Sequence, residues 1–307
     1  MARRTFDFVQ LDVFTKTPLQ GNALAIFPDA REISDREMQA LAKEMNLSET
    51  TFVIPRDEAT EAKEGKKVRI FTVAEELPFA GHPTLGTALY LHASRSANDQ
   101  KASNEIVLDL KVGKIPVRID QDPKEATGRV NGGAFGEMRQ RDPEFGRILA
   151  RDDVARTIRS DVDDIASEWP SQVVSTGLPF AVVPLRDSKI LEKLKGGFST
   201  EELLQGTGAK FIYFVSTGRS GDRFEARARM FFYGGEDPAT GSAAGCAAAW
   251  MAKYDIAKSD EQVLIRQGVE MKRPSEIFVR AMREGEQVSN VRVGGYAVEV
   301  LRGTVTL

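Results

Sequence analysis

Cysteine and histidine, on which disulfide and zinc chemistry depend, are nearly absent. The 307 residues include one cysteine, Cys246, and two histidines, His82 and His92. A single cysteine cannot form an internal disulfide. The histidines are ten positions apart with no cysteine or carboxylate at ligand spacing, which does not make a catalytic zinc site. The sequence therefore predicts no metal centre.

A bias in charge and a long apolar run are also absent. Lysine and arginine number 42 against 45 aspartate and glutamate residues, a net charge of −3. No basic stretch is interleaved with aromatic residues, as nucleic-acid binding requires. No segment approaches the ~20 apolar residues of a membrane helix, and polar residues interrupt the start of the chain where a signal peptide would be apolar. These absences predict a cytoplasmic protein whose partners are neither nucleic acid nor membrane.

The composition that remains is typical of a globular protein, with 41% hydrophobic and 28% charged residues. At ~150 residues per domain, the length predicts two domains. The polar segment 120–125 contains a proline and no apolar periodicity, so we expect the chain to cross between domains there. This gives a first domain of residues 1–122 and a second of residues 123–295.

Local patterns predict strands and helices within these domains. Ser34 and Glu37 form a capping box, and apolar residues follow at helical spacing up to Met45, which predicts a helix. Apolar residues recur at roughly helical spacing over 154–165 and predict a second, exposed helix. Short apolar or alternating segments predict strands at 9–13, 23–27, 52–54, 68–71 and 106–110.

Two pairs of similar segments indicate an internal repeat. GNALAIFP at 21–28 matches GLPFAVVP at 177–184, 156 positions later, and HPTLGTA at 82–88 matches DPATGSA at 237–243, 155 positions later. Two matches at nearly one offset, close to half the chain length, favour two domains of the same fold that arose by duplication. The alternative is a coincidence among common turn signals.

The second pair of repeated segments lies where helices are expected to begin. Each copy has a proline, a glycine and then a hydroxyl residue, Thr87 or Ser242, and the run 243–251 is dominated by alanine, a strong helix former. Helix N-termini bind carboxylates or phosphates through unpaired N–H groups, so two such ends could hold an anionic substrate. The alternative is that these are simply buried, well-packed helices.

Other motifs of nucleotide and hydrolase chemistry fit poorly. The segment 81–87 has the glycine spacing of a P-loop but lacks its lysine, and no G-x-G-x-x-G follows a strand. His82, Asp237 and Ser242 could supply a hydrolase triad. However, Ser242 lies in G-S-A-A-G rather than G-x-S-x-G.

Four strings carry a resemblance to a known family. They are FTKTPLQGNALAIFPDA from residue 14, AKEMNLSETTFVIP from 42, LPFAGHPTLGTAL from 77 and EDPATGSAAG from 236. In this order and spacing they resemble the PhzF-like family of phenazine biosynthesis, whose fold is that of diaminopimelate epimerase. The resemblance covers nearly the whole chain. It implies an α+β fold of two pseudo-symmetric domains, each a curved antiparallel sheet wrapped around a central helix, with the active site in the cleft between them. It also implies that the last strand, within 296–307, returns to the first domain. Members of the family are often homodimers, an assembly that this sequence neither supports nor excludes.

The resemblance also assigns roles to individual residues. Glu49 matches the family's acid/base glutamate, His82 its histidine, and Asp237 and Ser242 its aspartate and serine. Gly81 and Gly241 match glycines that supply backbone at the site. Thr87 joins Ser242 as a substrate-binding candidate from the repeat. The single Cys246 excludes a racemase with two thiols, so this residue is expected to pack as a small apolar side chain.

Taken together, these residues suit an isomerase that needs no cofactor. A carboxylate enclosed in a cleft can take a proton from one carbon and return it to another, and Glu49 suits that task. The expected substrate is a small carboxylate-bearing molecule, of which the family's trans-2,3-dihydro-3-hydroxyanthranilate is the example. The alternatives are a noncatalytic interaction protein on the same scaffold and a Ser/His/Asp hydrolase.

Overall fold

The computed structural model describes residues 3–95, 104–120, 130–220, 223–232 and 235–307. The chain forms two compact units, one of residues 1–138 and 294–307 and the other of residues 139–293. The boundary expected between residues 122 and 123 lies outside the described residues. The division between the units follows Met138.

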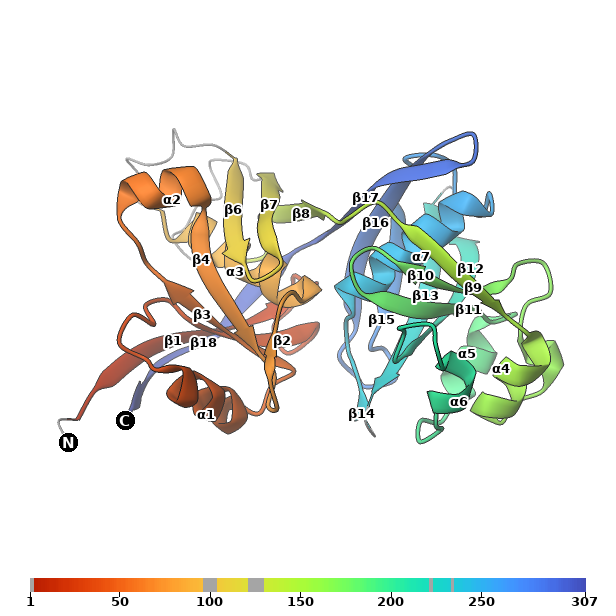
Figure 1. Ribbon diagram of the computed structural model, residues 1–307, viewed down its shortest axis with the longest axis horizontal. Helices are drawn as coiled ribbons and strands as arrows, with labels where there is room; N and C mark the ends of the chain where they lie inside the picture. Colours follow the sequence, from red (N-terminus) through yellow and green to blue (C-terminus); the bar gives the residue numbers. More distant parts are fainter. Residues whose placement is uncertain (1–2, 96–103, 121–129, 221–222, 233–234) are drawn as a thin grey trace. The chain divides into compact units, whose positions relative to one another are not determined.

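The first unit holds the beginning and the end of the chain, drawn from red to yellow and in blue in Figure 1. Its elements are β1 (Thr5–Val13), β2 (Asn22–Phe27), α1 (Asp35–Met45), β3 (Glu49–Ile54), α2 (Glu58–Glu64), β4 (Lys66–Phe71), β5 (Glu76–Leu77), α3 (Gly81–Ala93), β6 (Glu105–Leu110), β7 (Gly113–Asp120), β8 (Phe135–Arg139) and β18 (Ala297–Thr306).

The sheet of this unit has the strand order β18–β1–β2–β3–β4–β6–β7–β8, with β5 paired to the end of β4. Its strands surround α3, which contacts β1, β2, β3, β6 and β7. Every residue of α3 from Gly81 to Tyr90 is buried. A helix that is apolar on all sides must lie inside a core, which is why the sheet curves around it.

The second unit repeats this arrangement. Its elements are β9 (Glu144–Leu149), α4 (Arg151–Ile158), the 3₁₀ turn η3 (Val162–Asp164), β10 (Ser171–Ser175), β11 (Pro179–Pro184), α5 (Ser188–Lys193), α6 (Glu201–Leu204), β12 (Ile212–Ser220), β13 (Arg223–Phe232), β14 (Gly235–Glu236), α7 (Gly241–Lys253), β15 (Val263–Gln267), β16 (Ser275–Glu284) and β17 (Gln287–Gly295).

The strand order of the second unit is β9–β10–β11–β12–β13–β15–β16, with β14 paired to the end of β13. These strands surround α7, which contacts β10, β11, β12 and β16. The α+β class and the curved sheet around a central helix are therefore confirmed in each unit.

The sheets differ from the expectation in one respect, because they are mixed rather than wholly antiparallel. In the first unit β2 pairs in parallel with β3, and β4 with β6. The second unit has the same parallel pairs at β11–β12 and β13–β15. Parallel neighbours need a crossover connection, and α1 and α3 lie in the two crossovers of the first unit.

The structure corrects the register of the second repeated segment. Phe71 pairs with Glu76 as Phe231 pairs with Glu236, and the central helices begin at Gly81 and Gly241. Gly81 therefore corresponds to Gly241, and the match of HPTLGTA to DPATGSA is wrong by five positions. The two strings share a proline–glycine pattern but not a structural place, because 82–88 lies within α3 whereas 237–240 precedes α7.

The exposed helix expected over residues 154–165 is also shorter than predicted. Helix α4 ends at Ile158, because Arg159 takes a left-handed conformation with a φ of 58°. The chain then forms η3, and Ile165 makes a bridge to Leu185. The apolar residues at 162 and 165 thus continue the burial pattern without continuing the helix. In the described part of the chain, no helix has both the length and the apolarity to cross a membrane.

Candidate active site

Glu49 and His82 are brought together in the first unit by two different elements. Glu49 is the first residue of β3, where its backbone pairs with Leu24 of β2. His82 is the second residue of the central helix α3. Oε2 of Glu49 lies 3.5 Å from Nε2 of His82, and the side chains are 16% and 5% exposed. The sequence separates these two residues by more than thirty positions, and the curvature of the sheet around α3 closes that gap.

The local chain fixes the entry of Glu49 into the sheet. Helix α1 begins with the expected capping box between Ser34 and Glu37. It ends at Asn46, whose left-handed backbone, with a φ of 51°, turns the chain toward β3. Asparagine tolerates this conformation better than most residues because its short side chain bonds locally. The motif N-L-S-E therefore ends a helix and delivers a carboxylate to the start of a strand.

The His82 imidazole is held neutral. Burial lowers the pKa of His82 to about 3, and a hydrogen bond with the backbone of Ala23 opposes that shift only in part. Nδ1 lies 3.3 Å from the side-chain nitrogen of Asn22. Nε2 is buried, makes no hydrogen bond within the described residues, and faces Glu49. Glu49 therefore lies beside a neutral imidazole ring.

Close packing places the start of α3 against the strands of the first unit. A Cβ on Gly86 would lie 2.7 Å from side-chain carbons of Leu24 and Val13, so only glycine lets the helix approach this closely. Thr87, one residue further on, is fully buried, and its hydroxyl lies 3.0 Å from that of Thr51 on β3. The Thr87 hydroxyl is thus engaged inside the core. Its expected role in substrate binding stays a prediction.

Asp237 begins the segment that leads into α7 of the second unit. Its residue exposure is 9%, and its Oδ2 accepts a hydrogen bond of 2.6 Å from the Thr240 hydroxyl. The charge of this carboxylate also affects Tyr213. Burial, and to a smaller extent the charge of Asp237, raise the pKa of Tyr213 well above its usual value. The side chain of Gln267 bonds to the same segment at Asp237 and Thr240.

Gly241 and Ser242 form the first turn of α7. From Gly241 to Ala252, Ser242 is the one helix residue that is not buried. The carbonyl of Gly241 accepts a hydrogen bond of 3.0 Å from Gln140. Neither Ala80 before α3 nor Thr240 before α7 caps its helix with a side-chain hydrogen bond. Both helix starts therefore keep their N–H groups free of side-chain caps.

An arginine–glutamate pair, partly buried in the first unit and more deeply buried in the second, fixes the segment before each central helix, and sequence reasoning missed it. Arg69 on β4 bonds Glu76 on β5 through two hydrogen bonds of 2.8 and 3.0 Å. Arg229 on β13 bonds Glu236 on β14 through two of 2.8 Å. Each arginine also lies over the ring of the phenylalanine two residues later. The shared pattern R-x-F-x₄-E would have revealed the true register of the repeat.

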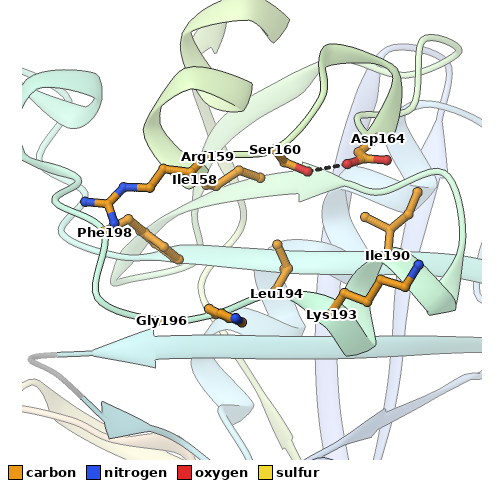
Figure 2. Close-up of a pocket in the computed structure, with 10 residues that line it drawn as sticks. Ile158, Arg159, Ser160, Asp164, Ile190, Lys193, Leu194, Gly196 and Phe198 are labelled. Carbon is orange, nitrogen blue, oxygen red and sulfur yellow. Dashed lines mark hydrogen bonds between the residues drawn. The ribbon is translucent and has the colours of Figure 1, made fainter.

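Two features of the second unit lie apart from these residues. Cys246 is fully buried inside α7, as expected, and burial raises the pKa of its thiol to about 11, so the thiol stays protonated. It is not a purely apolar contact, because its sulfur lies within hydrogen-bond distance of the Thr176 hydroxyl and of the carbonyl of Leu178. A cavity of about 440 Å³, shown in Figure 2, is lined by residues of and around α4 and α5, including the hydrogen-bonded pair Ser160 and Asp164. None of the predicted site residues lines it.

Comparison with known proteins identifies the family of this chain. A model of the family described as phenazine biosynthesis-like protein matches residues 11–303. The chain belongs to the phenazine biosynthesis-like family. It is 34% identical to a trans-2,3-dihydro-3-hydroxyanthranilate isomerase of Pseudomonas chlororaphis, over 98% of this chain and 99% of that protein. The resemblance found in the sequence is thereby confirmed, and an isomerase is the enzyme class that the relatives support.

Solved structures of the phenazine biosynthesis-like family share the fold. A predicted epimerase from Pseudomonas aeruginosa superposes with a TM-score of 0.79 at 32% identity, covering 98% of this chain and 99% of that one. A PhzF-family protein from Bacillus anthracis superposes with a TM-score of 0.81 at 24% identity, covering 98% and 99%. The predicted fold family is therefore confirmed.

Proposed function

We propose that this chain is a cofactor-independent isomerase that moves a proton between two carbons of a small carboxylate-bearing substrate. Glu49 is the group that carries the proton. The observation on which this rests is the pairing of the Glu49 carboxylate with a neutral His82 at the start of a buried helix. A protonated histidine would hold Glu49 as one member of an ion pair, whereas a neutral ring leaves the carboxylate able to gain and release a proton.

The proposed reaction uses Glu49 twice. Its carboxylate takes a proton from one carbon, so that a C–H bond breaks and an O–H bond forms, and the electron pair moves into the conjugated system of the substrate. The resulting carboxylic acid then returns the proton to a second carbon. The neutral His82 and the Asp237 carboxylate hold the polar groups of the substrate and adjust their protonation during these steps.

We propose that the substrate carboxylate binds at the starts of the central helices, with Gly81, Gly241 and Ser242 as its contacts. The N-cap side chains make no hydrogen bond to the helix N–H groups there, and Ser242 is the half-buried position of an otherwise buried helix segment. His82 and Ser242 are each the second residue of their central helix, so the two units carry complementary groups at matching places.

The test is proton NMR in heavy water with trans-2,3-dihydro-3-hydroxyanthranilate, the compound named for the P. chlororaphis relative. The native chain should isomerise it and incorporate deuterium, and Glu49→Gln should lose at least ~100-fold of the rate, as expected for loss of a general acid/base. Glu44→Gln, the same change at an exposed position on α1, is the matched control and should keep the native rate.

Full activity of Glu49→Gln would refute the assignment of Glu49 as the acid/base. If the native chain leaves this compound unchanged, the same experiment moves to other small carboxylates, and turnover of none of them would favour a noncatalytic binding protein. Acid release from generic esters would instead point to a hydrolase, because an isomerase releases no acid.

A further inference from the structure

The side chain of Gln267 is a fully buried amide whose orientation is fixed by its backbone partners. It lies at the end of β15 with 0% exposure. Its Nε2 donates to the carbonyl of Asp237 at 2.7 Å, and its Oε1 accepts from the N–H of Thr240 at 3.1 Å. A carbonyl can only accept and an N–H can only donate, so the amide cannot be flipped. Oε1 also accepts the Tyr213 hydroxyl at 3.1 Å.

This fixed amide determines the direction of the next two hydrogen bonds. Nε2 of Gln267 also lies 2.9 Å from Oγ1 of Thr240, and it carries only protons, so the threonine oxygen must accept. The single hydroxyl proton of Thr240 is then left for Oδ2 of Asp237, 2.6 Å away. This chain of hydrogen bonds therefore has one direction, from the Gln267 amide through the Thr240 hydroxyl to the Asp237 carboxylate. Oδ2 of Asp237 is thereby held as an acceptor.

The position of Thr240 supports a role beyond local structure. Thr240 is the N-cap of α7, where a threonine hydroxyl ordinarily accepts a hydrogen bond from the first turn of the helix. Here the hydroxyl makes no capping bond, and its proton goes to Asp237 instead. A substitution that removes the hydroxyl therefore removes no capping hydrogen bond from α7.

We propose that Thr240 and Gln267 are positioning residues that orient the Asp237 carboxylate and keep its Oδ2 a hydrogen-bond acceptor during turnover. This inference rests on the proposed function, because it assigns a task to residues that act through Asp237. A hydroxyl reversed away from Asp237 would remove this hydrogen bond, which orients the carboxylate and opposes protonation of Oδ2. The directional chain prevents both.

The test compares Thr240→Val with Thr240→Ser in the full-length chain. Valine keeps the shape of threonine and removes the hydroxyl, whereas serine keeps the hydroxyl and removes a methyl group. The proposal expects Thr240→Val to lose at least tenfold in kcat with a smaller change in KM, and Thr240→Ser to recover most of that loss. A role in packing alone predicts the opposite ranking, because serine leaves the larger void. Thr207→Val controls for the substitution itself, since that hydroxyl bonds only within its own turn in the described structure.

A second measurement requires no turnover. In the ¹H–¹⁵N spectrum, the two side-chain amide protons of Gln267 should exchange slowly with solvent in the native chain and in Thr240→Ser. One of them should exchange at least tenfold faster in Thr240→Val. Slow exchange of the Gln267 amide protons without any isomerase activity would refute the proposed function, while the directed hydrogen bonds from Gln267 to Asp237 would still be supported. Equal kcat values for the valine and serine variants, or equal exchange rates, would overturn the positioning role.

Discussion

Equivalent substitutions in the two arginine–glutamate pairs before the central helices should cause very different losses of stability. The Arg229 and Glu236 side chains are 7% and 13% exposed, whereas those of Arg69 and Glu76 are 19% and 21% exposed. Arg69 also contacts the largely exposed carboxylate of Asp35. Removing Glu236 thus takes the main partner from Arg229, which is more deeply buried than Arg69, the arginine that loses its partner when Glu76 is removed.

The magnitudes follow from burial. Glu236→Ala leaves the Arg229 guanidinium with the carbonyls of Leu191 and Leu194 at 2.9 Å and with Oε2 of Glu270, 3.9 Å from its Nε. Breaking a buried pair costs ~3–5 kcal/mol, and the remaining carboxylate places the loss toward the lower end of that range. Glu76→Ala should cost only about 1–2 kcal/mol, between the values for exposed and buried pairs. At a urea m-value of ~2 kcal/mol/M, the first substitution moves the unfolding midpoint by about 2 M.

Urea unfolding can assign the loss to the correct unit. The two tryptophans of the chain, Trp169 and Trp250, both lie in the second unit, so their fluorescence reports the unfolding that Glu236→Ala affects. Far-UV circular dichroism follows both units. Equal shifts for the two variants, or a loss below about 1 kcal/mol for Glu236→Ala, would refute the argument from burial. The double variant Arg229→Met with Glu236→Met should recover more than half of the single loss, because both charges of the pair are removed together and Glu270 keeps its ion pair with Arg227.

Two further predictions concern single buried groups. Burial lowers the pKa of His82 from 6.5 to about 3, so below pH 6.5 the unfolded chain binds a proton that the folded chain does not. The free energy of unfolding should fall by about 2 kcal/mol from this group between pH 6.5 and 5, and urea midpoints of His82→Gln should lack that component; an unchanged pH dependence would contradict the neutral ring. A Cβ on Gly245 would lie 1.9 Å from Oε1 of Gln140, so Gly245→Ala should cost ~1–3 kcal/mol in urea unfolding, while Gly218→Ala, with no atom within 4 Å of its added Cβ, should leave stability unchanged. An undisturbed midpoint for Gly245→Ala would show that Gln140 moves aside freely.

The sequence predicted the local elements and the fold family well. The capping box at Ser34 and Glu37 has its expected geometry, and helices begin at 81 and 241 as the proline, glycine and alanine pattern predicted. Periodicity could not predict which strands pair in parallel, because pairing depends on connections that cross the sheet. It also extended a helix through Arg159, where the left-handed backbone ends α4.

The candidate site was predictable only as a set of separate residues. Motifs identified Glu49 and His82, but their contact follows from the curvature of a sheet that no local pattern encodes. Thr240 and Gln267 gave no signal, since one looks like an ordinary N-cap and the other is a lone amide at the end of an apolar strand. Their importance arises from the direction of hydrogen bonds, which only coordinates provide.

The pairing of the last strand with the first has a consequence for synthesis of the chain. β18 runs antiparallel to β1 from Thr5 to Val13, and Arg4 and Leu307 exchange backbone hydrogen bonds beyond it; the blue and red strands lie side by side in Figure 1. The ribosome therefore releases every residue of the second unit before it completes the first. The unit made first must wait for its closing strand, so the usual order of cotranslational folding, from the N-terminus onward, is reversed here. A premature stop near the C-terminus would damage the unit that carries Glu49 and His82 rather than the one closest to the break.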